Sequence, residues 1–476
     1  MIEIDHLSFT YRNAPRLSLR DLDFTIGEGE FVLLAGPSGC GKSTLCLALN
    51  GIVPHLVGGE MRGSVRINGK DTRDHPVHEI VADVGLVFQN PDNQLFSLTV
   101  EEDVAFGLEN QGVLRSEMVE RVDTALSVTG MGPCRQREIS RLSGGQKQRT
   151  AIAGILAMKP GVLVFDEPTA DLDPQGTKEV LATIRALNKE EGRTVVIVEH
   201  KVQDVLPYAD RVICMEEGRI TRDVEASSLT PEDLGWGYRP RNGRTSLPLR
   251  RETIRFSGVH YRYPDGTAAL RGVDMTIGEG EFVAIVGENG SGKSTLAMQI
   301  NGLLRPSAGG VTVLGVDTSA MKARAISPGV GFLFQNPNHQ IFSDRVWREV
   351  ALGLEGRSDE PLERDRRVRE ALAAGDLTGF EDRDPNTLSR GERQRLAAAS
   401  ILATDPAIYV LDEPTTGQDH EHIMQLMDFI ESLNRSGRTI VLITHDHDLA
   451  RAYADRIFVM EKGTVVRQII RGESGP

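Results

Sequence analysis

Short apolar runs bounded by turn residues recur along the chain, and stretches with helical spacing separate them. The runs EFVLLAG (30–36), GVLVFDEP (161–168) and TVVIVEH (194–200) have the length and continuous apolar character of buried parallel strands. Between the last two, KEVLATIRALNKE (178–190) repeats its apolar residues at the period of a helix. This alternation predicts an α/β fold around a mainly parallel sheet. The polar residues that follow the strands would gather at the carboxyl edge of the sheet, where such folds bind ligands.

The same succession of strands, helices and polar motifs is written twice. IGEGEFVLLAGPSGCGKSTL (26–45) returns as IGEGEFVAIVGENGSGKSTL (277–296). A repeat of this length predicts two tandem domains rather than a solenoid. The stretch 229–251 is rich in Pro, Gly and Arg and lacks apolar periodicity. We therefore predict a first domain over 1–228, a linker over 229–251 and a second domain over 252–476.

Composition and charge narrow the class of protein. The 476 residues suffice for two or three domains, and 39% hydrophobic with 26% charged residues is an ordinary globular balance. A net charge of −14 argues against a nucleic-acid partner. The four cysteines show no CxxC spacing, which is typical of a reduced, cytosolic protein. Neither a signal peptide nor a membrane-spanning apolar run is apparent, so a membrane role would be that of a peripheral subunit.

Two Gly-rich loops match G-x-x-x-x-G-K-[ST], each after an apolar strand and before a helical pattern. Glycines let the backbone turn tightly and aim N–H groups at phosphate oxygens, and the following helix adds its positive end. We expect Lys42 and Lys293 to reach the β- and γ-phosphates, and Ser43 and Ser294 to bind Mg²⁺. Two such loops in one chain argue against a chance Gly-rich turn. The candidate nucleotide-binding residues are Gly36, Ser38, Gly39, Gly41, Lys42, Ser43 and Thr44, and Gly287, Asn289, Gly290, Gly292, Lys293, Ser294 and Thr295.

Each domain also ends one strand with two adjacent acids. VLVFDEP carries Asp166 and Glu167, and IYVLDEP carries Asp412 and Glu413. Successive side chains at a strand end point in opposite directions, so the two acids can take different roles. We expect the aspartates to hold Mg²⁺, directly or through water, and the glutamates to polarise the attacking water. Two histidines that close a further strand at the same offset are the remaining candidates: His200 and His445.

The last shared motif is LSGGQKQR (142–149), with LSRGERQR (388–395) as its counterpart. A serine at the start of a helix, followed by glycine, makes an anion-binding helix N-terminus. Each domain already has one phosphate loop, so a second anion site is useful only if it faces another domain's nucleotide.

In this combination and order, the motifs resemble those of ABC-type ATPases over nearly the whole chain. The resemblance implies two P-loop NTPase domains, each with a mainly parallel sheet flanked by helices and an α-helical signature subdomain. It implies hydrolysis of ATP, with Mg²⁺ as cofactor, by two domains that pair within one chain. Each ATP would lie between the phosphate loop of one domain and the signature of the other. That arrangement adds four residues to the ATP-binding set: Ser143, Gly145, Ser389 and Gly391.

The resemblance also assigns roles to single residues. Tyr11 and Tyr263 match the aromatic residue that stacks on adenine, and Tyr261 is a rival for the second position. Gln89 and Gln335 match the glutamine that senses Mg²⁺ and the attacking water. Two acids fall where the family has an interdomain aspartate: Asp173 and Asp419. The second signature has Arg390 and Glu392 where the first has Gly144 and Gln146. This difference predicts unequal sites, the one served by the first signature being stronger, and the alternative is two near-equal sites.

The segments after the two glutamines, FQNPDNQLF (88–96) and FQNPNHQIF (334–342), resemble a narrower group. These are the ATPase subunits of energy-coupling factor (ECF) importers, which take up vitamins or transition-metal ions. The resemblance implies grooves for helices of a transmembrane coupling subunit, with an arginine of that subunit meeting an acidic residue. An acidic groove in one domain and a neutral one in the other would meet two different helices. The groove residues are Asp92, Gln94, Asn338 and Gln340.

On this reading the chain is the ATP-hydrolysing motor of an importer, held at the cytoplasmic face of the cell membrane. Its partners would be the coupling subunit and a small substrate-binding membrane protein, and no nucleic acid. The alternatives are the two-domain ATPase subunit of a sugar-type importer, a soluble ribosome-associated ABC protein and a DNA-repair ABC ATPase. The short linker and the acidic chain argue against the second, and the lack of a zinc motif or coiled-coil insertion argues against the third. The transported substrate cannot be read from these motifs.

Overall fold

The computed structural model divides into two compact units, Met1–Gly237 and Tyr238–Pro476. Three residues assigned roles above lie outside the described residues: His200, Asp173 and Asp419. The side chain of Arg390 is not described either. The described residues are 1–12, 14–169, 172, 174–199, 201–234, 237–238, 241, 251–320, 326, 328–355, 360–416 and 420–471.

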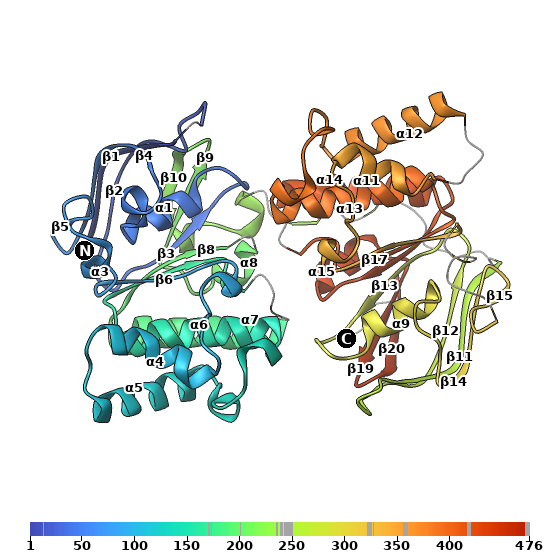
Figure 1. Cartoon of the computed structure of the whole chain (residues 1–476), viewed down its shortest axis with the longest axis horizontal. Helices are drawn as coiled ribbons and strands as arrows, with labels where there is room; N and C mark the ends of the chain where they lie inside the picture. Colours follow the sequence, from blue (N-terminus) through green and yellow to red (C-terminus); the bar gives the residue numbers. More distant parts are fainter. Residues whose placement is uncertain are drawn as a thin grey trace. The chain divides into compact units, whose positions relative to one another are not determined.

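Within its described part, the first unit contains a four-stranded antiparallel sheet and a six-stranded, mainly parallel sheet (Figure 1). The antiparallel sheet has the order β2-β1-β4-β5, with β1 Ile2–Tyr11, β2 Leu19–Ile26, β4 Gly59–Ile67 and β5 Lys70–Asp71. The larger sheet has the order β10-β9-β3-β8-β7-β6, with β3 Phe31–Ala35, β6 Val84–Val87, β7 Val162–Asp166, β8 Thr194–Val198, β9 Arg211–Glu216 and β10 Arg219–Glu225. The helices are α1 Lys42–Leu49, α2 Ile52–His55, α3 Val77–Ile80, α4 Val100–Asn110, α5 Arg115–Val128, α6 Gly144–Met158, α7 Pro174–Glu191 and α8 Val202–Val205.

The second unit repeats this plan. Its antiparallel sheet has the order β12-β11-β14-β15, with β11 Glu252–Arg262, β12 Ala268–Gly278, β14 Ala308–Val313 and β15 Val316–Asp317. Its larger sheet has the order β16-β17-β18-β13-β19-β20, with β13 Phe282–Val286, β16 Val330–Leu333, β17 Ile408–Asp412, β18 Thr439–Ile443, β19 Arg456–Glu461 and β20 Thr464–Ile470. Its described helices are α9 Lys293–Ile300, α11 Val346–Leu352, α12 Pro361–Ala374, α13 Arg390–Thr404, α14 His420–Arg435 and α15 His447–Tyr453.

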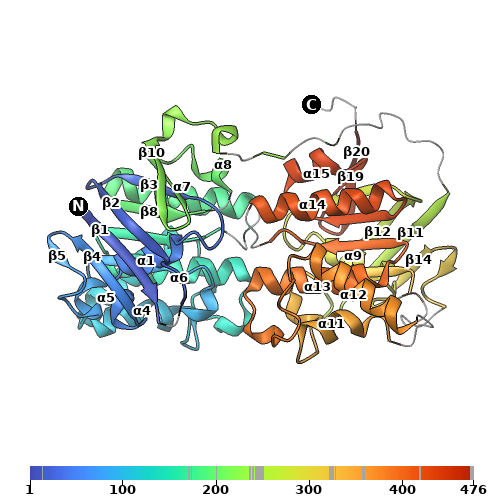
Figure 2. The same ribbon diagram turned by 90° about the horizontal axis from the view of Figure 1, so that it is seen from above.

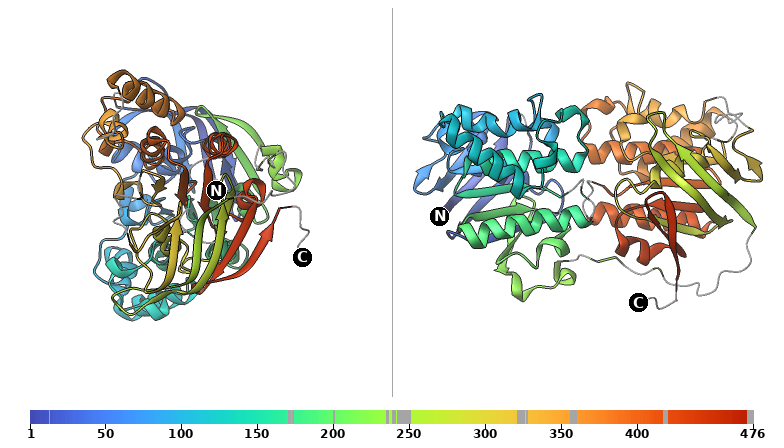
Figure 3. Two further views of the ribbon diagram at one scale, coloured as in Figure 1. Left: turned by 90° about the vertical axis from the view of Figure 1, so that its right-hand side faces the viewer. Right: turned by 90° about the horizontal axis from the view of Figure 1, so that it is seen from below.

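A small group of helices belongs to each unit besides the two sheets. Figure 2 shows α11 and α12 beside α13 in the second unit, and the right-hand view in Figure 3, from below, shows the corresponding helices α4 and α5 beside α6 in the first. The predicted fold class, two tandem P-loop domains with a mainly parallel sheet and flanking helices, is confirmed. Among the described residues, no helix has both the length and the apolar character that crossing a bilayer requires.

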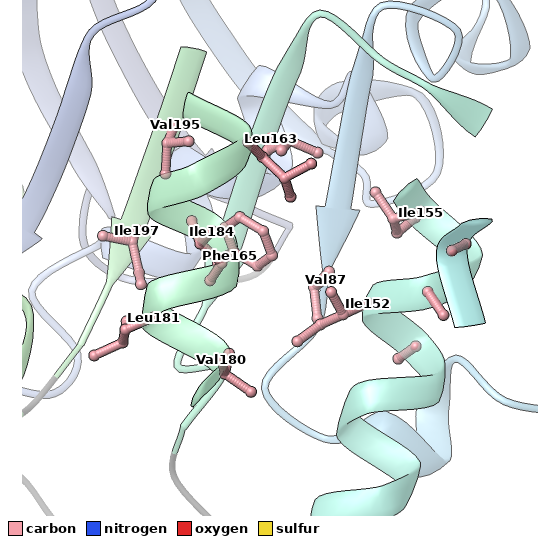
Figure 4. Close-up of a cluster of buried hydrophobic side chains, with 14 of the residues drawn as sticks. Val87, Ile152, Ile155, Leu163, Phe165, Val180, Leu181, Ile184, Val195 and Ile197 are labelled. Atoms are coloured by element: carbon pink, nitrogen blue, oxygen red, sulfur yellow. The ribbon is translucent and has the colours of Figure 1, made fainter. Parts of the chain in front are cut away.

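The core explains why the central strands are apolar at every position. Alternate residues of a strand point to opposite faces of its sheet. On one face Leu163 and Phe165 of β7 pack against α6 and α7 (Figure 4). On the other face Val162 and Val164 pack with α1 and with the antiparallel sheet, whose strands contribute Ile4 and other buried residues. Because both faces are covered, the sequence shows a continuous apolar run rather than an alternating one.

The segment expected to be a bare linker is partly packed. A 3-10 helix over Pro231–Leu234 brings Leu234 against the core of the first unit. Tyr238 packs against the core of the second unit, and Arg241 is buried there. The division between the units falls between these two contacts.

Candidate nucleotide-binding sites

The two phosphate loops connect β3 to α1 and β13 to α9. Gly36 has φ 145°, and a Cβ at this position would lie 2.1 Å from the carbonyl oxygen of Met215. Gly287 repeats this with φ 154° and 2.3 Å to the oxygen of Met460. Only glycine fits so close to a neighbouring strand, so each loop is tied to the sheet edge at its first residue. The crests of the loops, residues 37–39 and 288–290, are exposed and can be reached by a ligand.

The lysines of the loops fold back over their own backbone. Nζ of Lys42 donates to the carbonyl oxygens of Gly36 and Pro37 at 2.7 and 2.8 Å. Lys293 does the same to Gly287 and to the residue after it, at 2.7 and 3.0 Å. Both lysines are buried, and these bonds satisfy ammonium groups that would otherwise be costly to bury. A phosphate oxygen could replace the carbonyl oxygens with a small movement of the side chain.

The two glutamates that follow Asp166 and Asp412 have a strained backbone. Glu167 has φ 52° and Glu413 has φ 49°, in the left-handed region that residues other than glycine seldom adopt. Each backbone N–H donates to the neighbouring strand at 2.9 Å, to Val198 and Ile443 respectively, which holds the turn in place. Strain of this kind persists where the surrounding structure fixes a side chain for a task.

The glutamate side chains meet other predicted residues. In the first unit Nε2 of Gln89 donates to Oε2 of Glu167 at 2.6 Å. In the second unit Nδ1 of His445 lies 2.9 Å from Oε2 of Glu413. The structure thus brings the predicted glutamine to the acid in one domain and the predicted histidine to the acid in the other. Gln335 is exposed at the end of β16.

The buried carboxylate of Asp412 fits a magnesium ion. Burial raises the pKa of Asp412 to about 6, and the hydroxyl of Ser294 and the Lys293 charge act in the opposite direction while Glu413 adds to the rise. Its Oδ1 atom is buried without a hydrogen-bond partner. A carboxylate with an unused oxygen beside a hydroxyl is the hard oxygen donor set that Mg²⁺ prefers.

The predicted adenine-stacking tyrosines occupy matching positions. The hydroxyl of Tyr11 lies 2.9 Å from Oγ1 of Thr44, and that of Tyr263 lies 3.0 Å from Oγ1 of Thr295. Tyr261 instead lies edge-to-face beside Tyr263, with 5.0 Å between ring centroids. The contact with the threonine that directly follows each phosphate-loop motif favours Tyr263 over Tyr261 as the counterpart of Tyr11.

Both signature serines cap a helix. Ser143 Oγ accepts from Gln146 N–H at 3.3 Å, and the Gln146 side chain accepts from Ser143 N–H at 3.1 Å, so α6 begins with a capping box. Ser389 and Glu392 form the same box at the start of α13, at 3.2 and 2.7 Å. Glu392 therefore preserves the geometry of Gln146 and changes its charge. Gly145 and Gly391 lie in the first turns of these helices.

The four predicted groove residues divide into two kinds. Gln94 and Gln340 accept from the backbone N–H of Phe88 and Phe334 at 3.1 and 3.3 Å, so they brace their own loops. The carboxylate of Asp92 lies 2.6 Å from Nζ of Lys147 on α6. In the second unit the matching residues are Asn338 and Arg393, and Nε of Arg393 is buried without a hydrogen-bond partner.

Sequence reasoning missed two acids and the aromatic residues they position. Oδ1 of Asp103 accepts from the N–H groups of Phe96 and Ser97, both at 3.0 Å. Oε2 of Glu349 accepts from Phe342 and the following residue at 2.9 and 2.7 Å. The signal was available, since both acids sit on the helix that follows the repeated loop, seven residues after the aromatic one.

The sequence matches known proteins along most of its length. Residues 19–170 and 270–416 match the profile of the family described as ABC transporter. A relative from Methanosarcina mazei, named "Putative ABC transporter ATP-binding protein", is 40% identical over 520 residues, covering 98% of this chain and 88% of its own. A relative of the same description from Caldanaerobacter subterraneus is 39% identical, covering 99% and 92%. The solved archaeal ribosome recycling factor aABCE1, in complex with stalk protein aP1, is 21% identical with a TM-score of 0.68 over 98% of this chain and 90% of that one, a likeness of fold.

Proposed function

The chain belongs to the ABC transporter family, as an ATPase with two tandem domains, and we propose that it drives an importer of the energy-coupling factor type. The observation that carries this proposal is a pair of exposed apolar patches on the repeated FQNP-x-x-Q-[LI]-F loops and the helices that follow them. A vitamin or transition-metal ion would be the cargo. The chain would act as a peripheral subunit at the cytoplasmic face of the membrane.

The first of these surfaces, here called the first patch, consists of Phe96, Leu98 and Phe106. Phe96 is 64% exposed and Leu98 is 79% exposed. The rings of Phe96 and Phe106 lie edge-to-face with centroids 4.4 Å apart. Large apolar side chains gathered at one place on a surface indicate a binding site for an apolar partner. The two hydrogen bonds that Asp103 accepts from the loop backbone fix the conformation of the patch before a partner binds.

The second patch is assigned by correspondence, because exposed Phe342 and Leu352 occupy the positions of Phe96 and Phe106 in the repeat. Phe342 is 77% exposed, and Glu349 holds its backbone as Asp103 holds that of Phe96. Acidic Asp92 precedes Phe96 by four positions in the sequence, and neutral Asn338 precedes Phe342 by the same number. Two patches of the same design and different charge support a partner that presents two non-identical helices.

Asp92 is accessible to such a partner. Its side chain is 62% exposed, and the ion pair with Lys147 therefore contributes at most about 1 kcal/mol. An arginine of a coupling helix could share or replace this pairing, and a planar guanidinium would bind the carboxylate through two hydrogen bonds. The exposure lowers the energy expected for this contact well below that of a buried ion pair.

The chemistry proposed for the two sites is ATP hydrolysis at composite sites formed by both domains. Lys42 and Lys293 would exchange backbone carbonyl oxygens for the β- and γ-phosphates. Glu167 and Glu413 would orient and polarise the attacking water, and His200 and His445 would contact the γ-phosphate. Mg²⁺ would neutralise the developing phosphate charge, held by Ser43, Asp166 and Gln89 in one site and by Ser294, Asp412 and Gln335 in the other.

Copurification from detergent-solubilised membranes tests the role. We expect the chain to bring down a multi-span membrane protein and a small membrane protein, identified by mass spectrometry. Phe96→Ser with Leu98→Ser should abolish this. Leu114→Ser with Val128→Ser, a change of two other exposed apolar residues, should leave it intact. Recovery of ribosomal proteins in place of membrane proteins would favour the soluble, ribosome-associated alternative. If the Phe96→Ser, Leu98→Ser variant still binds the membrane proteins, the assignment of the first patch as the partner surface is wrong.

A further inference from the structure

One described residue of the linker region reaches a loop of the second nucleotide site. The hydroxyl of Tyr238 donates to Oδ2 of Asp446 at 2.6 Å. The ring of Tyr238 is tilted against that of His420, with 6.1 Å between centroids. His420 begins α14, and Asp446 directly follows His445 in sequence. The tyrosine therefore lies between the start of a helix and the loop that carries the candidate catalytic histidine.

Asp446 is the residue that shapes this loop. Its Oδ1 accepts from the N–H groups of Asp448 and Leu449 at 3.0 and 2.9 Å, which caps α15. Its own N–H donates to Oγ1 of Thr444 at 3.0 Å. His445 is thus held between two residues whose positions are fixed by hydrogen bonds. The remaining carboxylate oxygen of Asp446 is the one that Tyr238 occupies. Burial and the nearby carboxylate raise the pKa of Tyr238, so its hydroxyl keeps the proton that it donates.

Arg241, three residues after Tyr238, is also held by the second domain. Its backbone N–H donates to the carbonyl oxygen of Ala452 at 3.0 Å, and Nη2 donates to Oδ1 of Asn434 at 2.5 Å. Nε and Nη1 lie 3.4 and 3.5 Å from the carboxylates of Glu431 and Asp455. Tyr238 and Arg241 are thus both packed against the second domain.

The first domain makes the same contact with an arginine of its own. Arg185 on α7 donates to Oδ1 of Asn188 at 3.1 Å, and its Cζ lies 5.7 Å from the ring of Phe31. In the second domain the Cζ of Arg241 lies 6.0 Å from the ring of Phe282, and the position matching Arg185 is the acid Glu431. The guanidinium has the same place in both domains, but the second domain receives it from the linker region.

The histidine loops of the two domains differ in the corresponding way. The residue after the first histidine is Lys201, which starts α8 without a side-chain cap. A lysine cannot accept a hydrogen bond from a tyrosine hydroxyl. The arrangement of carboxylate, helix cap and linker tyrosine therefore belongs to the second domain, and any effect of the linker on a histidine should be confined to the second ATP site.

We propose that Tyr238 is a positioning residue of the second ATP site, which sets the place of His445 through its hydrogen bond to Asp446. The inference rests on the proposed function, since it requires that His445 contacts the γ-phosphate. Loss of the hydroxyl would let the histidine loop adopt additional conformations. The fraction of bound ATP that meets a correctly placed histidine would fall, while the binding of ATP through Lys293 and the phosphate loop would not change.

Steady-state hydrolysis by the full chain tests this. In Tyr238→Phe we expect kcat to fall by about threefold to tenfold with little change in KM, the size of effect typical of coupling through a connected network. The decrease in kcat should persist in the Glu167→Gln background, in which only the second site keeps its catalytic glutamate. It should vanish in the Glu413→Gln background, in which the second site has lost that glutamate. Hydrogen exchange of residues 444–450 should become faster in Tyr238→Phe, and this measurement does not depend on turnover.

Two further variants separate the possible causes. Tyr453→Phe removes a hydroxyl from the other end of α15, where it contacts Met424 Sδ at 3.9 Å, and should change neither kcat nor exchange at 444–450. In Asp446→Ala, which removes the acceptor of the tyrosine hydroxyl, the Tyr238→Phe change should have no additional effect. If His445→Ala in the Glu167→Gln background hydrolyses ATP normally, the assignment of His445 fails and the inference with it. If His445→Ala is inactive but Tyr238→Phe has wild-type kcat and exchange, the inference about the linker alone is overturned.

Discussion

Replacing Arg241 by Met should destabilise the second domain and leave the first unchanged. The Arg241 side chain is 4% exposed, and the carboxylates beside it, Glu431 and Asp455, are 13% and 3% exposed. Methionine keeps an apolar stem to pack near Phe282, so the change is mainly the loss of a positive charge and its hydrogen bonds. Two acids would then lose the cation that they share.

The size of the destabilisation depends on the contacts that Glu431 and Asp455 keep in the variant. Removing one member of a buried ion pair costs about 3–5 kcal/mol, because the remaining charge stays buried. Glu431 keeps a contact with Arg435 at 2.7 Å, and Asp455 keeps the N–H of Phe282 at 3.0 Å. We therefore expect the lower end, about 3 kcal/mol. At about 2–4 °C per kcal/mol for a domain of this size, the melting temperature of the second domain should fall by about 6–12 °C.

Thermal proteolysis of the full chain, read by mass spectrometry, follows the peptides of each domain separately. Arg185→Met is the matched control, since it removes the equivalent guanidinium of the first domain. There Asp210 is 35% exposed and also meets Lys189 at 3.4 Å, so the cost should be about 1 kcal/mol or less. Equal shifts for the two variants, or a shift of first-domain peptides in Arg241→Met, would refute the reasoning.

Three further predictions concern the sites and the partner surface. Glu413→Gln should suppress hydrolysis more than Glu167→Gln, because the proposed second site uses the first signature with neutral Gln146; equal losses in a phosphate-release assay would reject this ranking. Asp92→Asn should weaken assembly with the membrane partner severalfold and Asn338→Ala should not, in a pull-down at graded salt, and an unchanged Asp92→Asn complex would remove Asp92 from the interface. Because the pKa of Asp412 is raised to about 6 from an ordinary 3.8, its folded-state carboxylate becomes protonated as the pH falls through about 6. Hydrolysis by the Glu167→Gln chain should then require more Mg²⁺ at pH 5.5 than at pH 7.5, and an Mg²⁺ requirement independent of pH would contradict this.

The sequence was informative where local pattern and burial agree. Strands such as Val162–Asp166 are buried on both faces, so their apolar runs are unbroken and easily recognised. The antiparallel sheets were not predicted, because their strands are irregular. In β1 the pairing shifts between Ile4 and Leu7, and His6 has φ 48°, which breaks the period of two on which strand prediction depends.

The ion pairs between residues far apart in the chain could not be predicted from the sequence. The stretch 229–251 contains five arginines, and nothing local distinguishes Arg241 from the others. Its partners Glu431 and Asp455 lie about two hundred positions away, and only the folded chain shows that the three meet. The role of Glu392 was within reach, because Ser389 three residues earlier completes the sequence pattern of a capping box.

The capping boxes bear on how much reorganisation the signatures undergo when they meet a nucleotide. Ser143 Oγ uses a lone pair to accept from Gln146 N–H, and its own proton remains available to an oxyanion. The helix start is already ordered, so binding a phosphate there costs little conformational entropy. Donors placed in advance are also worth more to a developing negative charge than donors that must first turn toward it. In the proposed composite sites, the free-energy barrier to binding ATP should therefore lie in bringing the phosphate loop of one domain to the signature of the other. Ordering the signature itself should add little to that barrier.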